Sequence, residues 1–167
     1  MKNSVRNFNA YIVDLGNSAL IPLKNLPHVA DYMTLDDGEK FRKFMGIITE
    51  EIKDRKQKFA QAMVQNFFVY NQGADEKLKA ILIVIDNYDV VKELGDEAED
   101  FFKKTIREGA GLGIFFAVTA TRSSALRSAV MASFKEKITG FNFDESENRA
   151  VLGRCEYSLP DSIKGRA

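Results

Sequence analysis

The sequence predicts an α/β domain in which a mostly parallel sheet is flanked by helices. Short apolar runs, rich in β-branched and aromatic residues, alternate with longer stretches whose apolar residues recur at helical spacing. This alternation is typical of a parallel sheet with helices on its faces. Because the chain has 167 residues, 45% of them hydrophobic, we expect a single domain covering residues 1–167.

The first half of the chain predicts one strand and one long helix. The run "FNAYIVDLG" at residues 8–16 predicts a strand closed by a glycine. From residue 36 to about residue 70, apolar residues such as Phe41, Phe44 and Ile48 follow helical spacing. The charged run at residues 50–58 is expected to form the solvent-exposed face of this helix.

The second half predicts three further strands and two helices. In "LKAILIVIDNYDVV", residues 78–91, six apolar residues run into Asp86 without alternation, which predicts a strand buried on both faces. A helix at 93–109 has acids early and bases late, as the helix dipole favours, and a buried strand follows at 111–121. Ser123 or Ser124 is expected to cap a helix to about Phe134, before a more polar strand at 136–144.

Composition excludes several classes of function. The 24 basic residues balance the 24 acidic ones, so no net positive field favours a nucleic-acid partner. A single cysteine, Cys155, can make neither an internal disulfide nor a Cys-rich metal site, and no apolar run is long enough to be a signal peptide or a membrane span. We therefore expect a cytosolic chain, or the cytosolic part of a larger protein.

The residues that follow the apolar runs are the candidates for a ligand site, because ligands bind beyond the carboxyl ends of parallel strands. These residues are Asp14, Asp86, Asn87, Thr119 and Thr121. An aspartate in the position of Asp86 suits a magnesium site, although the strand pattern alone favours a structural cap of the next loop. Asp14 is expected to cap the turn before Gly16.

Several blocks of the sequence resemble, in the same order, the ATPase domain of the FtsK/SpoIIIE family. They are "YIVDLGNSALIPLKNLPHVADYMTLD", "EEIKDRKQKF", "YN" at 70–71, "ILIVIDNYDVV", "REGAGLGIFFAVTATR" and "VLGR". "DLGNSALIPLKNLPH" and "VTATR" are more similar to the C-terminal ATPase-like modules of type VII secretion proteins of the EssC/EccC kind than to a DNA translocase. The resemblance implies a RecA-like P-loop NTPase fold, with ATP and magnesium as cofactors of the parent family, in a membrane-anchored protein of Gram-positive bacteria.

The resemblance also implies that parts of the nucleotide site are missing or altered. The family's phosphate loop precedes the "YIVD" strand, but no GxxxxGK[ST] occurs in this chain, so we expect it to begin downstream of its first, Walker A, strand and to bind no cofactor by itself. Asn87 follows Asp86 where the family's Walker B strand has a glutamate that polarises the attacking water. An amide cannot accept a proton, so the chain is predicted to be inactive although its family hydrolyses ATP.

Other family positions differ as well. Ala110 stands where relatives often have an arginine, and Thr121 stands where FtsK proteins usually have a glutamine, whereas Arg122 is retained. The residual nucleotide or magnesium positions are thus Asp86, Thr121 and Arg122, and Asp86 could hold magnesium only together with a phosphate loop.

Without catalysis, the resemblance implies substrate recognition or regulation of the motor. Terminal modules of this kind take the export signal of a WXG100-type secreted protein in a hydrophobic groove. The candidate groove residues are Leu126, Val130, Met131 and Phe134. Their spacing is equally that of a core face, which is the favoured interpretation. Neighbouring ATPase modules of the same polypeptide and further copies of the chain are the other expected partners, at the cytoplasmic face of the membrane.

Two alternatives stay open. A DNA translocase fragment would be expected to show a basic pore loop and a winged-helix domain, and neither is visible in the sequence. The other alternative is a fragment of an active ATP-driven translocase whose phosphate loop lies outside this chain.

The resemblance finally predicts a sheet with an open position. In the strand order 5-1-4-3-2 of RecA-like sheets, the missing first strand would lie beside "GIFFAVTA". The four remaining strands should be "YIVDLG", "ILIVID", "GIFFAVTA" and "KITGFNF". An unpaired apolar edge is a template for association. We therefore expect "KITGFNF" either to move inward and pair with "GIFFAVTA", or to leave that edge to a second copy of the chain.

Overall fold

The computed structural model describes residues 4–141 and 144–154. It divides into two compact units, residues 1–119 and residues 120–167. The first unit contains the sheet and its covering helices, and the second contains short helices. Each unit is described below by itself, and the expected single domain stays a prediction.

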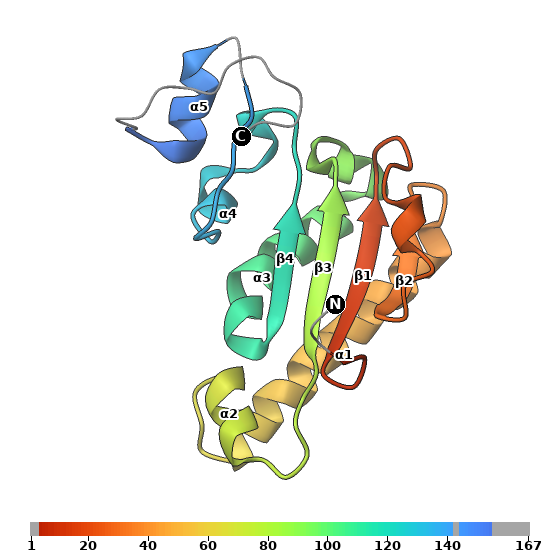
Figure 1. Ribbon diagram of the computed structural model, residues 1–167, viewed down its shortest axis with the longest axis vertical. Coiled ribbons are helices and arrows are strands. Elements are labelled where there is room, and N and C mark those ends of the chain that lie inside the picture. Colours follow the sequence, from red (N-terminus) through yellow and green to blue (C-terminus); the bar gives the residue numbers. More distant parts are fainter. Residues whose placement is uncertain (1–3, 142–143, 155–167) are drawn as a thin grey trace. The chain divides into compact units, whose positions relative to one another are not determined.

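The first unit is built on a four-stranded parallel sheet (Figure 1). Its strands are β1 (Phe8–Asp14), β2 (Val29–Met33), β3 (Ala80–Asp86) and β4 (Ile114–Val118). Their order across the sheet is β2-β1-β3-β4, and all three neighbouring pairs are parallel. The strands predicted at 8–16, within 78–91 and within 111–121 are confirmed.

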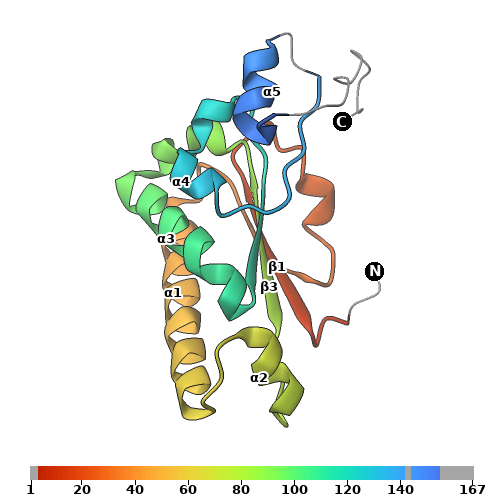
Figure 2. The ribbon, with the colours of Figure 1, turned by 90° about the vertical axis from the view of Figure 1, so that its left-hand side faces the viewer.

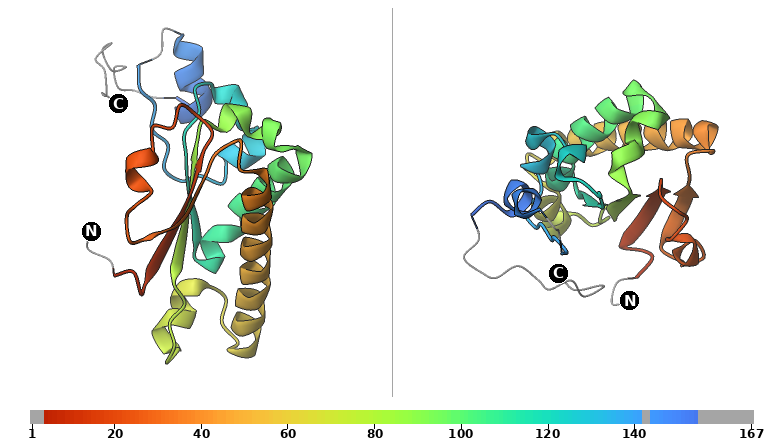
Figure 3. Two further views of the ribbon diagram at one scale, coloured as in Figure 1. Left: turned by 90° about the vertical axis from the view of Figure 1, so that its right-hand side faces the viewer. Right: turned by 90° about the horizontal axis from the view of Figure 1, so that it is seen from above.

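One face of the sheet is covered by two long helices, α1 (Gly38–Gln61) and α3 (Asp96–Leu112) (Figures 2 and 3). Phe44 of α1 packs on Tyr11 of β1, with ring centroids 5.2 Å apart. Phe41 of α1 packs on Phe102 of α3 at 5.7 Å. Because aromatic side chains bury large apolar areas, this layer forms the core of the unit.

The central strand β3 is not buried on both faces, so that prediction is wrong. Ile81, Ile83 and Ile85 are buried, whereas the alternate residues of β3 are only partly buried. The register pairs Ile83 with Tyr11, which lies against α1, so the buried residues point to the helix-covered face. In this unit both long helices lie on that one face, and the apolar composition of β3 exceeds what a single covered face requires.

The long helix predicted to reach residue 70 ends earlier, because the chain turns after residue 61. Met63 adopts a left-handed conformation with φ 53°, and its N–H donates to the carbonyl of Ala60 at 3.2 Å. The N–H of Val64 donates to the carbonyl of Phe59 at 3.0 Å. These two bonds form the motif that commonly terminates helices, here without the usual glycine. A second helix, α2 (Phe67–Gly73), then begins behind Asn66, whose side chain accepts from Phe68 and Val69.

The 3₁₀ helix η2, the helix α3 and two glycines lie between β3 and β4. The 3₁₀ helix η2 (Tyr88–Leu94) precedes α3, so the helix predicted at 93–109 is confirmed with shifted ends. Gly113 closes α3 at φ 76°, and a Cβ there would lie 2.2 Å from the ring of Phe67. A Cβ on Gly109 would lie 2.5 Å from the carbonyl of Ile114. Both positions therefore require glycine.

The edge strand β2 was not predicted. It follows the 3₁₀ helix η1 (Ile21–Leu23) and pairs with β1, where the register shifts between Ala10 and Tyr11. Its five residues are too few to show a clear period in the sequence, and only Tyr32 and Met33 are buried. The strand is set by pairing with β1 rather than by its own pattern.

The second unit contains η3 (Ser123–Ala125), α4 (Ser128–Met131) and α5 (Glu145–Leu152). The helix predicted from residue 123 to about residue 134 is thus reduced to two short pieces. No strand occurs within residues 136–141, so the predicted fourth strand is wrong over its described part, while residues 142–143 lie outside the described residues. In this unit the N–H of Ser123 donates to Glu147 at 2.9 Å, which connects η3 to α5.

The predicted strand order is confirmed for three strands. β1, β3 and β4 are neighbours in that sequence, as the second, third and fourth strands of a RecA-like sheet would be. The prediction that "KITGFNF" moves inward and pairs with β4 is wrong over its described part. Residues 137–141 are not a strand and do not pair with β4. Pairing of the β4 edge with a second copy stays a prediction.

Candidate functional site

The candidate site lies where β1 and β3 end side by side. Asp14 and Asp86, the last residues of these strands, are partners in the parallel register. The N–H of Leu15 also donates to the carbonyl of Asp86 at 3.1 Å, which holds the two strand ends together. The carboxyl ends of parallel strands are where ligands bind in such sheets, so this edge is the candidate functional site.

The side chain of Asp14 stabilises the loop that follows it through hydrogen bonds. Its carboxylate accepts hydrogen bonds from the N–H of Gly16 at 3.3 Å and the N–H of Leu20 at 3.0 Å. It also accepts from the hydroxyl of Tyr32 at 2.6 Å. The expectation that Asp14 caps the turn before Gly16 is confirmed, and with three donors this buried carboxylate is fully engaged.

The surroundings of Tyr32 extend the pH range over which its hydroxyl keeps its proton. Burial of its ring, followed by its hydrogen bond to the Asp14 carboxylate and the negative charge there, raises the pKa of Tyr32 from 10.0 to about 12. The nearby charge of Asp86 acts in the same direction. Tyr32 is therefore a permanent donor at neutral pH, and it fixes β2 to the end of β1.

Asp86 is held by a hydrogen bond to one of its oxygens, and its other oxygen lies close to the backbone of Gly16. Oδ1 accepts a hydrogen bond from the hydroxyl of Thr119, one residue beyond β4, at 2.7 Å. That hydroxyl in turn accepts from the N–H of Asn87 at 2.9 Å. Oδ2 faces Gly16, where a Cβ would lie only 2.7 Å away. The three strand ends are thus joined around one carboxylate.

Asn87 has an unusual backbone conformation. It lies in the left-handed region, at φ 61° and ψ 63°, and precedes η2. Asparagine is one of the few residues other than glycine that adopts this conformation readily. Asn87 carries an amide and no carboxylate, so its side chain cannot take a proton from water. The geometry of this position suits asparagine as a turn residue.

The described residues contain neither a cluster of metal-ligating side chains nor a phosphate-loop motif. Within residues 4–141 and 144–154, no group of three or more His, Cys, Asp or Glu side chains could hold a metal ion. Asp86 is the one carboxylate at the β3 end, and magnesium is usually bound by one or two carboxylates together with substrate phosphates. The chain also has no GxxxxGK[ST] loop to hold those phosphates.

The other predicted site residues lie outside the group of strand ends described above. Thr121 and Arg122 belong to the second unit, where both are exposed. Ala110 is exposed in the last turn of α3, which leads into the start of β4 and hence lies at the opposite end of the strands. An arginine at position 110 would therefore not share a site with Asp86.

The predicted groove residues lie on or beside α4 in the second unit. Val130 is 3% exposed, and Leu126, Met131 and Phe134 are partly buried. Burial of Val130 agrees with its interpretation as a core residue. The other three retain accessible apolar surface.

Sequence analysis missed the role of two residues. Thr119 was noted as a strand-end residue, but its bridge between Asp86 and Asn87 follows only from the fold. Tyr32 had no signal at all, because its contact with Asp14 depends on the unpredicted strand β2. Gly16 carried a usable signal, since a glycine two residues after a strand-end aspartate can mark a close approach of the backbone.

The parallel sheet, with this strand order and an aspartate at the end of β3, matches the RecA-like ATPase domains of the P-loop class. The sequence profile of the FtsK/SpoIIIE family matches residues 2–152, and the chain belongs to this family. It is 45% identical over 157 residues to the ESX secretion system protein EccC of Geobacillus thermodenitrificans. It is 35% identical over 159 residues to the type VII secretion system protein EssC of Staphylococcus aureus.

These relatives are much longer proteins. The match covers 94% of this chain in both comparisons, but only 10% of the Geobacillus protein and 11% of the Staphylococcus protein. The chain thus spans about a tenth of the length of the curated relatives it matches.

Solved structures of EssC and EccC proteins have the same fold. EssC (ATPases 2 and 3) from Geobacillus thermodenitrificans matches with a TM-score of 0.93 at 43% identity, over 98% of this chain and 31% of that one. EccC (ATPases 2 and 3) from Thermomonospora curvata, in complex with a signal sequence peptide, matches with a TM-score of 0.71 at 20% identity. That match covers 78% of this chain and 25% of the other, and at this identity it supports the fold alone. Among the described residues, no helix is both long and apolar enough to cross a membrane.

Proposed function

We propose that this chain is a degenerate, non-hydrolysing ATPase-like module of a type VII secretion coupling ATPase. The observation that carries the proposal is Asn87, which follows Asp86 at the end of β3 where the family has a water-polarising glutamate. Its left-handed backbone favours the asparagine that is present. The module would serve the secretion motor through binding rather than through chemistry.

The binding function that we propose is recognition of an export signal from a WXG100-type protein, or regulation of the neighbouring ATPase modules. The kind of ligand proposed is the one named for an EccC structure, in complex with a signal sequence peptide, with which this chain shares its fold. Support for the proposal comes from the partly buried apolar side chains of Leu126, Met131 and Phe134 in the second unit. We place the module in the cytosolic part of a membrane-anchored protein, because a solved relative at 43% identity is named as a cytoplasmic domain of EssC.

The proposed lack of hydrolysis is tested on a polypeptide extended N-terminally so that it includes a phosphate loop. We expect ATP binding without magnesium-dependent turnover above background, since the site has no general base. The same polypeptide with Asn87→Glu should recover little activity, because glutamate fits the left-handed conformation poorly. Turnover in the unaltered polypeptide that disappears on Asp86→Ala would contradict the proposal.

That last outcome would support the second candidate, an active translocase whose phosphate loop lies outside this chain. The observation that favours it is the length of the relatives, of which this chain matches about a tenth. A site assembled from a longer polypeptide could bring its own catalytic groups. The hydrolysis assay therefore separates the two candidates directly.

Signal recognition is tested with a fluorescent peptide from the C-terminus of a WXG100-type protein. We expect binding by anisotropy that is weakened by Phe134→Asp, whereas Ala132→Asp at an exposed position of the same segment should bind normally. Equal binding by both variants would place the peptide elsewhere. No binding by the folded, unaltered chain would leave regulation of neighbouring modules as the function.

A further inference from the structure

Every polar group of Thr119 is bonded to one of the residues that turn the chain at the end of β3. Its N–H donates to the carbonyl of Ile85 at 3.0 Å, and its carbonyl accepts from the N–H of Tyr88 at 2.8 Å. Its hydroxyl donates to Oδ1 of Asp86 at 2.7 Å and accepts from the N–H of Asn87 at 2.9 Å. A single residue beyond β4 therefore holds this whole turn.

The hydroxyl of Thr119 makes the turn at Asn87 depend on the carboxylate of Asp86. A hydroxyl has one hydrogen, and here it is donated to the carboxylate, so a lone pair of the oxygen faces the N–H of Asn87. Asn87 has a left-handed backbone, which is unfavourable for most residues. The next residue, Tyr88, is only 6% exposed, and its ring lies 6.4 Å from that of Phe102. The carboxylate thus acts, through the hydroxyl, on the path of the chain into η2.

The surroundings of Asp86 suit this structural role better than they suit a bound cation. Oδ1 accepts from the Thr119 hydroxyl, and a Cβ on Gly16 would lie 2.7 Å from Oδ2, so the carboxylate is confined on two sides. The carboxylate of Asp14, at the neighbouring strand end, already accepts three hydrogen bonds. In the part of the chain that the structure describes, no group of three or more His, Cys, Asp or Glu side chains could hold a metal ion.

We propose that Asp86 and Thr119 form a structural bridge that holds the Asn87 turn, so that the carboxylate serves this turn and is not a magnesium ligand. The bridge is built from the first unit alone and does not depend on the function proposed above. The two roles of the carboxylate differ in the chemistry that they need. The bridge needs only an acceptor at position 86, which an amide oxygen also provides, whereas magnesium is bound through the charge of a carboxylate.

Hydrogen exchange of backbone amides, followed by NMR on the 167-residue chain without nucleotide, tests the bridge. Thr119→Val removes the hydroxyl at an exposed position, so exchange of the Asn87 N–H should accelerate by about tenfold. Thr119→Ser and Asp86→Asn each keep their part of the bridge and should stay within about threefold of the unaltered chain. Thr49→Val is the matched control, because Thr49 is also exposed but its hydroxyl donates to the carbonyl of Met45 within α1.

Asp86→Ala removes the acceptor and should accelerate exchange at Asn87 about as much as Thr119→Val does. The two changes together should have no larger effect than either alone, because both break the same bridge. Near-ultraviolet circular dichroism confirms that each variant keeps its packed aromatic rings. Equal exchange in Thr119→Val and Thr119→Ser, or additive effects of Asp86→Ala and Thr119→Val, would overturn the proposal.

Calorimetry with ATP and magnesium tests whether Asp86 is a cation ligand. In the polypeptide extended N-terminally to include a phosphate loop, Asp86→Asn should change the magnesium-dependent part of the ATP affinity by less than about threefold. A loss of about tenfold or more would assign Asp86 to the cation and overturn the proposal. Absence of magnesium-dependent binding in the unaltered polypeptide would support the bridge but contradict the ATP binding expected from the proposed function, so the two proposals can fail separately.

Discussion

At the scale of single residues, Asn87 decides how the strand-end site is interpreted. Its φ of 61° is a conformation that costs most side chains free energy, but that asparagine and glycine adopt readily. Its N–H also donates to Thr119, which ties the turn to the end of β4. The left-handed turn and an amide side chain in place of a carboxylate therefore occur at one position.

This link predicts an asymmetric effect of substitution at position 87. Asn87→Glu should lower the free energy of unfolding by about 1 kcal/mol, because glutamate is strained in the left-handed region. Asn87→Gly should change it by only a few tenths of a kcal/mol. Urea unfolding followed by circular dichroism measures both values. Equal stability of the two variants would show that the backbone here is not restrained by the fold.

Tyr32 predicts how stability depends on alkaline pH. In the unfolded chain its phenol titrates near 10, but in the folded chain its pKa is about 12, so the folded state holds the proton more strongly. The resulting stabilisation is fully present below pH 10 and is lost as the pH rises from 10 to 12. Tyr32→Phe should remove this contribution to the pH dependence while it retains the buried ring. Urea unfolding midpoints, measured between pH 9 and 12 for the unaltered chain and for Tyr32→Phe, test this prediction. An identical change of the midpoint with pH in both proteins would contradict the assignment.

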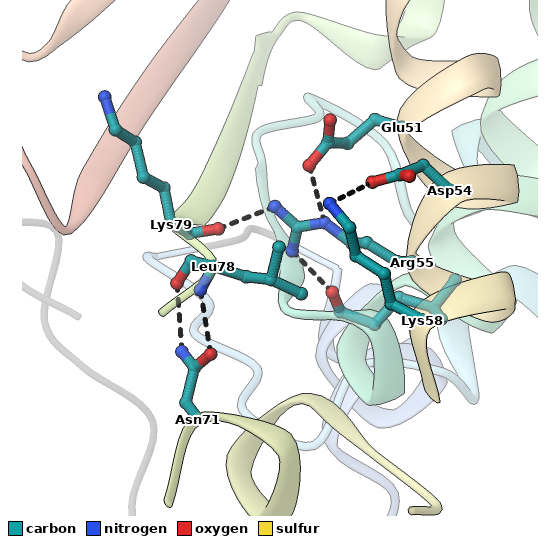
Figure 4. A network of polar contacts seen from close by, with 8 residues as sticks. Glu51, Asp54, Arg55, Lys58, Asn71, Leu78 and Lys79 are labelled. Atoms are coloured by element: carbon teal, nitrogen blue, oxygen red, sulfur yellow. Dashed lines mark hydrogen bonds and ion pairs between the residues drawn. The ribbon is translucent and has the colours of Figure 1, made fainter. Parts of the chain in front are cut away.

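At the scale of elements, Arg55 joins three segments of the first unit (Figure 4). The residue is 1% exposed, although the sequence predicts an outer face of the helix for the run that contains it. Its guanidinium donates to the carbonyl of Leu112 and to that of Lys79, both at 2.6 Å, and to Glu51 at 2.8 Å. Arg55 therefore connects α1 to the end of α3 and the start of β3.

Replacement of Arg55 should strongly reduce the stability of the chain. Arg55→Ala leaves buried carbonyl groups without donors and Glu51 without its cation, so we expect a loss of about 3–5 kcal/mol in the free energy of unfolding. Arg55→Lys should recover only part of this loss, because an ammonium group lacks the planar fork. The matched control is Lys53→Ala, whose exposed pair with Glu50 is 3.7 Å long and should matter by less than about 0.5 kcal/mol. A mild Arg55→Ala variant in thermal or urea unfolding would show that water replaces the donors.

Sequence patterns predicted the elements that have a strong hydrophobic period. They missed features that depend on contacts with other segments of the chain. The strands β1, β3 and β4 follow from apolar runs, and α1 and α3 from helical spacing. The break at Met63 was missed because no glycine or proline marks it, although Asn66 before "FFVY" is a usable cap signal. Arg55 was misplaced because a charged run on a helix gives no indication that a tertiary carbonyl will accept from one of its members.

The same distinction between local sequence patterns and contacts of distant segments applies to the candidate site. Asp14 and Asp86 were predicted because each directly follows an apolar run, and their side-by-side placement follows from parallel pairing. The contacts of Tyr32 and Thr119 could not be predicted, since they join segments that are far apart in the sequence. Local patterns identify the strand ends, whereas the identity of their partners requires the register of the sheet.

At the scale of the whole molecule, the two units differ in how much core they contain. Among the described residues, the largest fully buried side chains all belong to the first unit, and most of them lie between the sheet, α1 and α3. The second unit contributes Val130 alone to the buried hydrophobic residues described. Because burial of apolar surface is the main source of folding free energy, the first unit should carry most of the stability of the chain.

This distribution predicts that a chain ending at Ala120 folds without the second unit. It retains the three strand ends and the Thr119 hydroxyl that joins them, so its urea unfolding should stay cooperative and its near-ultraviolet circular dichroism should keep the signal of the packed aromatic rings. The same truncation removes Leu126, Met131 and Phe134, so it should abolish binding of the signal peptide proposed above. A truncated chain that loses its aromatic signal would show that the second unit is required for the core. A truncated chain that is folded and still binds the peptide would move the recognition site to the first unit.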